Sequence, residues 1–374
     1  MERCPMRILV FGPYLNPPHY GGGEKYLFDV ADYLSREHQV EVGVSSAEPL
    51  SSDRIVKLKV SYEEFLGKDL GAVKFVSVPL RTKEFVLKKL FWTKQYDCIF
   101  YLTDGSFFFS LANKNIAHIQ FPLKLDKSKF WQRKKLDNWD VKVTNSEFTK
   151  SIVEPSWPVK VDMVHQPMVN VEQIQEGLDL TNKENIILNV GRFFSHLHAK
   201  RQDILVEIFR RLSQKYGKLV QDWKLVLIGS VEEEDYAQKV AKQAEGLNVE
   251  IYHQVSRKDL IDWFRRSSIY WHATGYRVNP HKEPEKVEHF GITTVEAMAA
   301  GNVPIVIGKG GQLEVVGEDL EEWTWLTQRD CLKKTAQIIR NIQLRQKLQA
   351  QAQDRAHCFG PDVFYQKLEE MINA

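Results

Sequence analysis

Short apolar segments alternate with amphipathic helical segments along this chain, and the alternation begins twice. The first run opens with the apolar residues Arg7–Gly12, followed by a glycine-rich turn, a helical pattern over Glu24–Ser35 and a second apolar segment at Val40–Val44. The second run opens at Ile186–Val190 and continues with a helical pattern over Gln202–Tyr216. Strands that alternate with helices predict parallel sheets joined by helical crossovers. We therefore expect two α/β domains.

The remaining elements follow the same alternation, judged from periodicities of two and 3.6 residues. In the first run, further strands are expected at Ile55–Val60, Cys98–Leu102, Ile116–Ile119 and Val141–Asn145. In the second run, strands are expected at Lys224–Ile228, Val249–Tyr252, Ile269–His272 and Val303–Ile307, and helices at Asp235–Gln243, Arg257–Arg266 and Thr293–Ala300.

The length of 374 residues exceeds what one core usually holds, which also favours two domains. We place one Rossmann-like domain at 1–168, a linker at 169–185 and a second Rossmann-like domain at 186–356. A C-terminal segment, 357–374, contains an amphipathic helix expected to cross back to the N-terminal domain. Ligands of such sheets bind at the carboxyl ends of the strands, so we expect the two domains to face a cleft.

Composition limits the classes of function. The chain is 43% hydrophobic and 27% charged with a net charge of +2, which argues against a general nucleic-acid binder. Its four cysteines form no C-x-x-C pair, so neither structural zinc nor a disulfide framework is expected. The N-terminus has no signal-peptide pattern, and no apolar run reaches the ~18 residues of a spanning helix. We expect a cytoplasmic protein, or one held at the inner face of a membrane.

Two glutamates eight positions apart, Glu288 and Glu296, flank an expected loop-to-helix junction. Phe290 and Gly291 mark the break, and Gly301 ends the short helix that follows. The first turn of that helix offers unpaired backbone N–H groups and a partial positive charge, which suit a phosphate. A carboxylate before the turn and another inside the helix can bind sugar hydroxyls. The pattern therefore predicts a site for a nucleotide-sugar.

Gly191 and Arg192 leave the end of an expected strand, and Lys200 precedes the next helix. Two cations opposite a helix N-terminus can hold a diphosphate and neutralise it as a leaving group. The alternative is a solvated basic loop. Because these cations are expected opposite the helix start in the glutamate motif, we favour the diphosphate. His196 and His198 have no third ligand near them, so we assign no metal site.

In the first run, Gly21, Gly22 and Gly23 lie between the first strand and the first helix. Glycines there let the backbone approach a phosphate or a sugar closely, although an ordinary flexible turn would look the same. The pattern is not G-x-G-x-x-G, so the dinucleotide fingerprint is absent. His118 follows a short strand and can contact a substrate or serve as a structural core histidine.

Basic and aromatic residues are interleaved at Lys124–Lys135, where six Lys and Arg face Asp126 alone, and again at Lys88–Trp92. Such a patch suits anionic lipid head groups or a lipid diphosphate acceptor. The alternative is an ordinary solvated face.

Taken together, these motifs resemble the retaining family 4 glycosyltransferases of the GT-B fold, in the branch that includes the lipid-linked-oligosaccharide α-1,2-mannosyltransferase. The resemblance covers nearly the whole chain. It rests on Gly21–Glu24, His118–Pro122, Asn145–Thr149, Val190–Arg192 with Lys200, and Glu288–Gly301. The spacing from Arg192 to Lys200 is slightly longer than is commonest in the family and includes two additional histidines, His196 and His198.

The resemblance implies that the domain at 1–168 lies on the acceptor side and that the domain at 186–356 binds the nucleotide-sugar. It also implies a role for each matching residue. Glu288 would bind the donor sugar and Glu296 the ribose, while Arg192 and Lys200 would hold the diphosphate. The remaining implied contacts are His118 to the donor sugar, backbone at Gly22, Gly23, Phe290, Gly291 and Ile292 to the phosphates, and backbone near Val255 and Ser256 to the base.

The implied reaction is transfer of a hexose, with retention of configuration, to a hydroxyl of a glycan or lipid-linked glycan in glycan or cell-envelope polysaccharide synthesis. GDP-mannose is the favoured donor, and UDP-sugars are the alternative donors. No nucleophile stands out, so we expect front-face attack, with positioning and charge stabilisation supplied by the protein. Neither a cofactor nor a metal is expected, because Arg192, Lys200 and the helix end take over the metal's role. Two other hypotheses are a non-catalytic sugar-nucleotide binder and a nicotinamide-dependent oxidoreductase, which the missing fingerprint disfavours.

Overall fold

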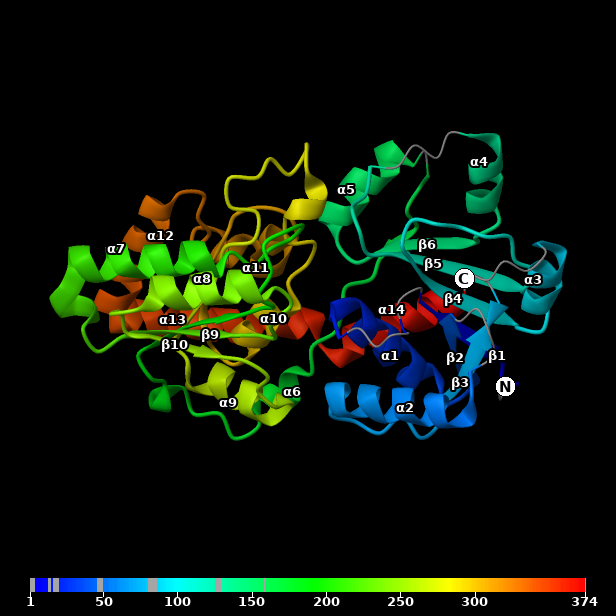
Figure 1. Ribbon diagram of the computed structural model, residues 1–374, viewed down its shortest axis with the longest axis horizontal. Helices are drawn as coiled ribbons and strands as arrows, with labels where there is room; N and C mark the ends of the chain where they lie inside the picture. The colour runs from blue at the N-terminus through cyan, green and yellow to red at the C-terminus, as the bar shows by residue number, and fades with distance from the viewer. Residues whose placement is uncertain are drawn as a thin grey trace. The chain divides into compact units, whose positions relative to one another are not determined.

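The computed structural model describes residues 4–12, 15, 20–45, 50–79, 86–124, 129–157 and 159–373. The chain folds into two compact units, each built on a parallel sheet (Figure 1). Unit 1 comprises Met1–Met168 and Asp362–Ala374, and unit 2 comprises Val169–Pro361. The expected α/β class with two sheets is confirmed.

Unit 1 contains a seven-stranded sheet in the order β3-β2-β1-β4-β5-β6-β7, and every pair of neighbours is parallel. Its strands are β1 (Arg7–Phe11), β2 (Gln39–Ser45), β3 (Lys74–Val78), β4 (Cys98–Thr103), β5 (Lys114–Ile119), β6 (Val141–Thr144) and β7 (Met163–Val164). Its helices are α1 (Gly22–Leu34), α2 (Ser52–Leu66), α3 (Val86–Thr93), α4 (Phe130–Asp137), α5 (Glu147–Ser156) and α14 (Pro361–Asn373).

The strand expected at Ile55–Val60 is wrong, because these residues lie within helix α2. The side chain of Ser51 caps the helix by accepting a hydrogen bond from the Arg54 N–H at 3.4 Å, and Gly67 ends it with a φ of 66°. Only one side of the helix is buried, through Leu58 and Tyr62. The β-branched residues that favoured a strand include Val56 and Val60, which are exposed on the other side.

Helix α14 comes from the C-terminus and packs within unit 1, as the expected crossing helix would. Tyr365 stacks on Tyr33 of α1 with ring centroids 4.0 Å apart, and α14 lies beside α1 in Figure 1. The Nε2 atom of His165 lies 3.0 Å from the carbonyl of Phe364, and the Nζ atom of Lys367 donates to the carbonyl of Val164. These bonds join the end of the chain to the segment that leaves β7.

Unit 2 contains a five-stranded parallel sheet in the order β10-β9-β8-β11-β12. Its strands are β8 (Ile186–Val190), β9 (Lys224–Ile228), β10 (Val249–Tyr252), β11 (Ile269–His272) and β12 (Val303–Val306). Its helices are α6 (Val171–Gln175), α7 (Gln202–Val220), α8 (Glu234–Ala244), α9 (Arg257–Arg266), α10 (Ile292–Ala299), α11 (Gly311–Glu321), α12 (Gln328–Arg340) and α13 (Ile342–Ala356).

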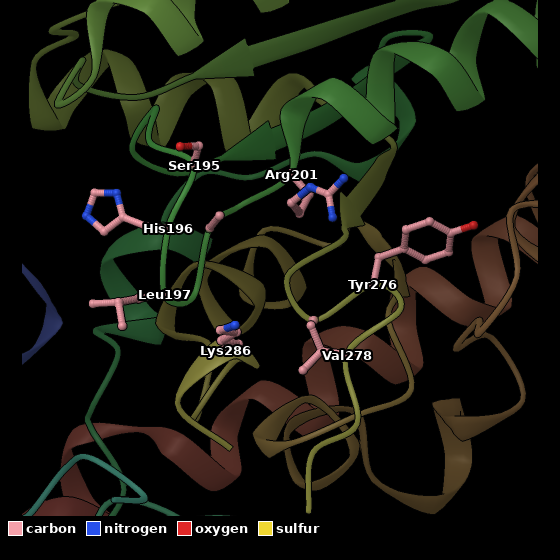
Figure 2. Close-up of a pocket in the computed structure, with 9 residues that line it drawn as sticks. Ser195, His196, Leu197, Arg201, Tyr276, Val278 and Lys286 are labelled. Atoms are coloured by element: carbon pink, nitrogen blue, oxygen red, sulfur yellow. The ribbon is translucent and has the colours of Figure 1, made fainter. Parts of the chain in front are cut away.

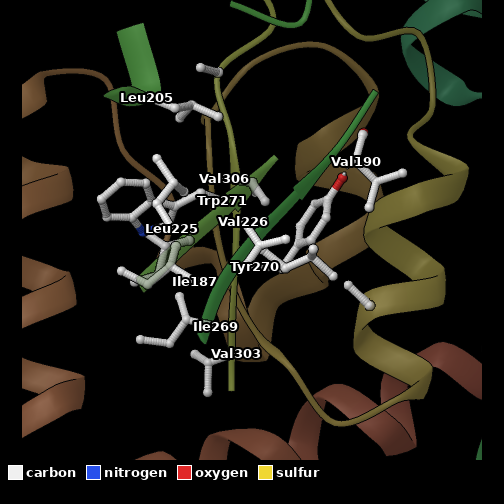
Figure 3. Close-up of a cluster of buried hydrophobic side chains, with 14 of the residues drawn as sticks. Ile187, Val190, Leu205, Leu225, Val226, Ile269, Tyr270, Trp271, Val303 and Val306 are labelled. Carbon is white, nitrogen blue, oxygen red and sulfur yellow. Dashed lines mark hydrogen bonds between the residues drawn. The ribbon is translucent and has the colours of Figure 1, made fainter. Parts of the chain in front are cut away.

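The core of unit 2 is formed by apolar side chains of this sheet and the helices that cover it (Figure 3). Trp271 and Tyr270 of β11 are fully buried among aliphatic residues of the neighbouring strands. The segment 169–185, expected as a linker, contributes to this core. Val171 and Ile174 of α6 are fully buried in it, so the segment is part of unit 2 rather than a free connection.

Candidate active site

Lys200 lies directly over the backbone that leaves β8. A Cβ atom placed on Gly191 would lie 2.5 Å from Cγ of Lys200, so only glycine leaves room for the lysine stem. The Nε2 atom of Gln202 donates to the carbonyls of Gly191 and Arg192 at 2.9 and 3.2 Å. The start of α7 is thereby tied to the end of β8, and the long connection between them is fixed at both ends.

Glu288 receives two charged or polar partners on one carboxylate oxygen. Its Oε2 atom lies 2.6 Å from Nζ of Lys200 and 2.9 Å from Nε2 of His272. Burial raises the pKa of Glu288, but the Lys200 charge and the His272 hydrogen bond outweigh it and hold that pKa well below its usual range. Burial lowers the pKa of His272, partly countered by the glutamate. Glu288 is therefore a carboxylate at neutral pH and not a proton donor.

Glycines hold the backbone on which Glu288 sits. Gly291, the N-cap of α10, has a φ of 114°, and a Cβ atom there would lie 2.0 Å from the Gln312 side chain. Gly310 also has a positive φ, and its Cβ atom would lie 2.3 Å from the carbonyl oxygen of Glu288. That carbonyl accepts a hydrogen bond from the Gly311 N–H at 2.8 Å. The loop before α10 and the turn before α11 are thus locked together without side chains between them.

Gln312 supports the same junction from inside. It is fully buried, and its side chain accepts from the Thr294 hydroxyl at 2.9 Å and donates to the carbonyl of Phe290 at 3.3 Å. The Phe290 side chain is buried against Phe359, so only its backbone can serve a ligand. The first N–H groups of α10 have no partner within the helix, which leaves them available for an anion at Gly291 and Ile292.

Glu296 lies one helical turn further on and is paired with a different cation. Its Oε1 atom lies 2.6 Å from the Arg257 guanidinium, and only 4% of its side chain is exposed. Arg257 is the first residue of α9, which Ser256 caps by accepting from the Asp259 N–H. Val255 and Ser256 therefore reach Glu296 through Arg257, which brings these three predicted donor residues into one region of unit 2.

Arg192 is directed elsewhere. Its Nη1 atom lies 2.5 Å from Glu232, its Nη2 atom lies 3.4 Å from Nε2 of His198, and its guanidinium lies over the Phe194 ring. Burial lowers the pKa of His198 to about 2, so this histidine is neutral. The structure brings Lys200 to Glu288, but Arg192 is held by Glu232, which lies in the connection from β9 to α8.

In unit 1, the glycine turn forms the start of α1. The Gly21 N–H donates to Glu24 at 3.1 Å, and Gly22 and Gly23 form the first helical turn. A Cβ atom on Gly23 would lie 2.6 Å from Oε1 of Gln120. Gln120 follows β5 and is partly exposed, so it is the side chain that meets the glycine turn.

His118 lies two residues earlier and is fully buried. Its ring stacks on Tyr26 with centroids 3.9 Å apart, and its Nε2 atom lies 3.3 Å from the carbonyl of His165. Burial, and then the nearby His165, hold the pKa of His118 well below its usual value. The alternative of a structural core histidine matches this environment.

The sequence reasoning missed four side chains at these positions: His272, Arg257, Gln312 and Gln120. Each lies at or next to the end of a strand or the start of a helix, which is where ligands of parallel sheets bind. His272 was visible as a polar residue ending an apolar strand, and Gln120 as the polar residue after His118. Nothing in the sequence pairs Arg257 with Glu296. Within the described ranges, no three His, Cys, Asp or Glu side chains gather as metal ligands, and no helix there is long and apolar enough to cross a membrane.

The second half of the chain is similar in sequence to known glycosyltransferases. A family model described as Glycosyl transferases group 1 matches residues 170–355. A GDP-Man:Man(3)GlcNAc(2)-PP-Dol alpha-1,2-mannosyltransferase of Neurospora crassa is 28% identical over 208 residues, which are 48% of this chain and 35% of that protein. The match thus spans about a third of the curated relative's length.

Solved structures resemble the chain over nearly its full length. A glycosyltransferase from Rickettsia africae has a TM-score of 0.73 at 16% identity and covers 99% of both chains. HepE of Anabaena, solved in complex with UDP-glucose, has a TM-score of 0.66 at 16% identity, covering 98% of this chain and 99% of that one. At these identities the likeness concerns the fold alone.

Proposed function

This chain is identified as a glycosyltransferase of the GT-B fold by its group 1 glycosyl transferase domain at residues 170–355, and we propose that it transfers a hexose from a nucleotide-diphosphate-sugar. The proposed acceptor is a hydroxyl of a glycan or lipid-linked glycan. GDP-mannose is the favoured donor, supported by the likeness to a GDP-mannose-dependent relative, and a UDP-sugar is the alternative. The observation that carries the proposal is the Lys200–Glu288–His272 cluster beside the start of α10.

In the proposed reaction, Glu288 accepts a hydrogen bond from a donor-sugar hydroxyl and His272 orients its carboxylate. Lys200 and the first N–H groups of α10 stabilise the charge that develops on the departing diphosphate. Arg192 joins them by exchanging its exposed Glu232 partner for a phosphate, which is a stronger bidentate partner. Glu296 binds the ribose with Arg257 beside it, and the base lies near Val255 and Ser256.

The reaction is proposed to retain the anomeric configuration, as in family 4 enzymes. Glu288 already shares its carboxylate with Lys200 and His272, an arrangement that favours an electrostatic role over that of a covalent nucleophile. The acceptor hydroxyl then attacks from the face that the diphosphate leaves, and the leaving phosphate oxygen takes its proton. The protein's cations balance the diphosphate charge, so we propose a metal-independent reaction.

In unit 1, the proposed substrate contacts are the backbone of Gly22 and Gly23 and the amide of Gln120. Gln120 replaces His118 in this role, because His118 is buried in the core while Gln120 reaches the glycine turn and is partly exposed. A neutral amide can both donate to and accept from sugar hydroxyls.

A donor panel tests the function. GDP-mannose, GDP-glucose, UDP-glucose and UDP-N-acetylglucosamine are added to the purified protein, and thermal unfolding and nucleoside diphosphate release are followed. At about 100 times its Kd, a true donor stabilises the native state by roughly 2.7 kcal/mol. We expect the largest shift with GDP-mannose, and the same diphosphate release with and without EDTA. A protein that no sugar nucleotide stabilises would not be this enzyme.

We also propose that unit 1 binds an anionic membrane surface through α3 and α4, which we name the basic-aromatic surface. Phe91 of α3 and Phe130 and Trp131 of α4 expose 64%, 64% and 68% of their area. Lys88 and Lys89 lie on α3, and Lys129, Arg133, Lys134 and Lys135 lie on or next to α4. Residues 125–128 of the predicted patch lie outside the described residues.

The two helices of the basic-aromatic surface are joined by one segment. The Leu111 N–H donates to Thr93 at the end of α3, and the Ser110 N–H donates to Asn138 at the end of α4. Exposed aromatic rings flanked by lysines suit the boundary between lipid head groups and acyl chains. Each lysine near an anionic surface adds ~1 kcal/mol of attraction.

Vesicle co-sedimentation checks this surface. Binding to phosphatidylglycerol-containing vesicles is expected to fall at least tenfold in Trp131→Ser and to weaken with added salt, because both apolar burial and charge attraction contribute. Leu326→Ser is the control, since Leu326 is also exposed but lies in unit 2. Equal binding by the two variants would count against the basic-aromatic surface.

A further inference from the structure

Unit 2 has a cavity of about 250 Å³ next to the Lys200–Glu288 pair, and none of its lining residues belongs to the proposed donor site (Figure 2). Two loops form it, the connection from β8 to α7 and the connection from β11 to α10. Ala199 and Arg201, which line it, are the neighbours of Lys200, and Lys286 lies two positions before Glu288. The cavity therefore adjoins the centre where the sugar is proposed to be transferred.

The backbone of both loops is held in an unfavourable conformation. Four described residues other than glycine have a positive φ, and three of them lie in these loops: Leu197, Arg201 and Arg277. The left-handed region is disfavoured for residues with a side chain. Such positions persist only where the surroundings fix them, and they concentrate at ligand sites. Their clustering around one cavity indicates a binding function.

Hydrogen bonds to other parts of unit 2 fix several residues that line the cavity. The Nζ atom of Lys309 donates to the carbonyl of Val278 at 2.7 Å. Arg201 donates twice to Asp203, at 2.9 and 3.1 Å. In the same connection as Arg201, the Ser195 N–H donates to Glu233 at 2.8 Å. The walls are thus preformed, as is usual for small-molecule sites.

The chemistry of the lining selects the ligand. Leu197, Ala199 and Val278 offer an apolar surface, and Leu197 remains 49% exposed. The cations Arg201 and Lys286 face carboxylates of their own, Asp203 and Glu283, so the cavity carries little net charge. A neutral ring with one C–H face and several hydroxyls fits this combination better than a phosphate does.

We propose that this cavity binds one sugar residue of the acceptor glycan, beside the residue whose hydroxyl attacks. That the bound sugar belongs to the acceptor rests on the proposed glycosyl transfer. The binding of a sugar in this cavity can be measured independently of that function. It assigns Leu197, Arg201, Val278 and Lys286 to acceptor recognition, distinct from the donor contacts of Glu288 and Lys200.

Saturation-transfer NMR with methyl α-mannoside, methyl α-glucoside and α-1,2-mannobiose tests the proposal on the full chain. We expect at least one of these sugars to receive saturation from the protein in the absence of a donor. Val278→Trp, which fills the cavity, should weaken that sugar's affinity at least tenfold while the donor panel still shifts the unfolding temperature.

A matched pair of truncations guards against a folding defect in Val278→Trp. Leu197 and Ile342 expose 49% and 51% of their area, and only Leu197 lines the cavity. Leu197→Ala is expected to weaken the sugar severalfold and Ile342→Ala to leave it unchanged. Sugar binding that is equal in all three variants, absent from the wild type, or replaced by binding of inorganic pyrophosphate would overturn the proposal. Retained sugar binding with no response to any donor would instead overturn the proposed function.

Discussion

Replacing Glu288 with glutamine, or Lys200 with methionine, is expected to lower the rate of sugar transfer by about 10²–10³-fold, the usual loss when one preorganised electrostatic partner of a transition state is removed. Glutamine keeps the shape of Glu288 and its contact with His272 but has no charge. Methionine keeps the apolar stem that lies over Gly191 but has no ammonium group. Transfer is measured as nucleoside diphosphate release with the best donor of the panel.

Stability must be separated from catalysis in these variants, because Lys200 and Glu288 are 14% and 13% exposed. Removing one partner of a buried pair leaves an uncompensated charge and destabilises by as much as ~3–5 kcal/mol. Removing both is often neutral. The double variant Glu288→Gln with Lys200→Met is therefore expected to unfold near the wild-type temperature and yet to be inactive. A double variant that is stable and turns over normally would refute the assignment of this pair.

Sequence patterns were sufficient for elements that lie between clear turn signals or carry a strong helix cap. The expected bounds of β9, β10, β11 and α9 coincide with the observed ones. Three of these are short strands between clear turn signals, and α9 has a serine cap and a strong amphipathic pattern. Helix α2 was predicted as a strand because β-branched residues such as its exposed valines favour strands. The burial of Leu58 and Tyr62 depends on tertiary contacts, which the local sequence does not show.

Some residues of the candidate site could likewise be recognised from the sequence and others could not. The glutamate motif was recognisable because its two carboxylates and its glycines lie within one continuous segment. The partners His272 and Arg257 lie on other elements, 16 and 39 positions before the glutamates they contact. Only the parallel order β8-β11-β12 and the placement of α9 bring them together. Burial favours the structural alternative for His118, and burial cannot be read from a polar residue beside an apolar strand.

His118 and Gln120 are expected to respond to alanine in opposite ways. His118→Ala removes a fully buried ring that stacks on Tyr26, and the resulting cavity should lower the free energy of unfolding by about 2–4 kcal/mol. Gln120→Ala removes a partly exposed amide and should change stability by no more than ~0.5 kcal/mol. Urea unfolding of both variants measures this difference.

The effects on activity are expected in the reverse order, with a larger loss in Gln120→Ala than in His118→Ala. Under conditions where both variants are fully folded, Gln120→Ala is expected to lower kcat/KM at least tenfold, because a hydrogen bond to a sugar hydroxyl is worth about 1–3 kcal/mol when its partner is left unsatisfied. Folded His118→Ala is expected to stay within a few-fold of the wild type. Gln120→Asn, which keeps the amide but shortens its reach, should fall between alanine and wild type. A stable His118→Ala protein without activity would return the substrate contact to His118, because a side chain that acts only by packing cannot abolish turnover in a molecule that remains folded.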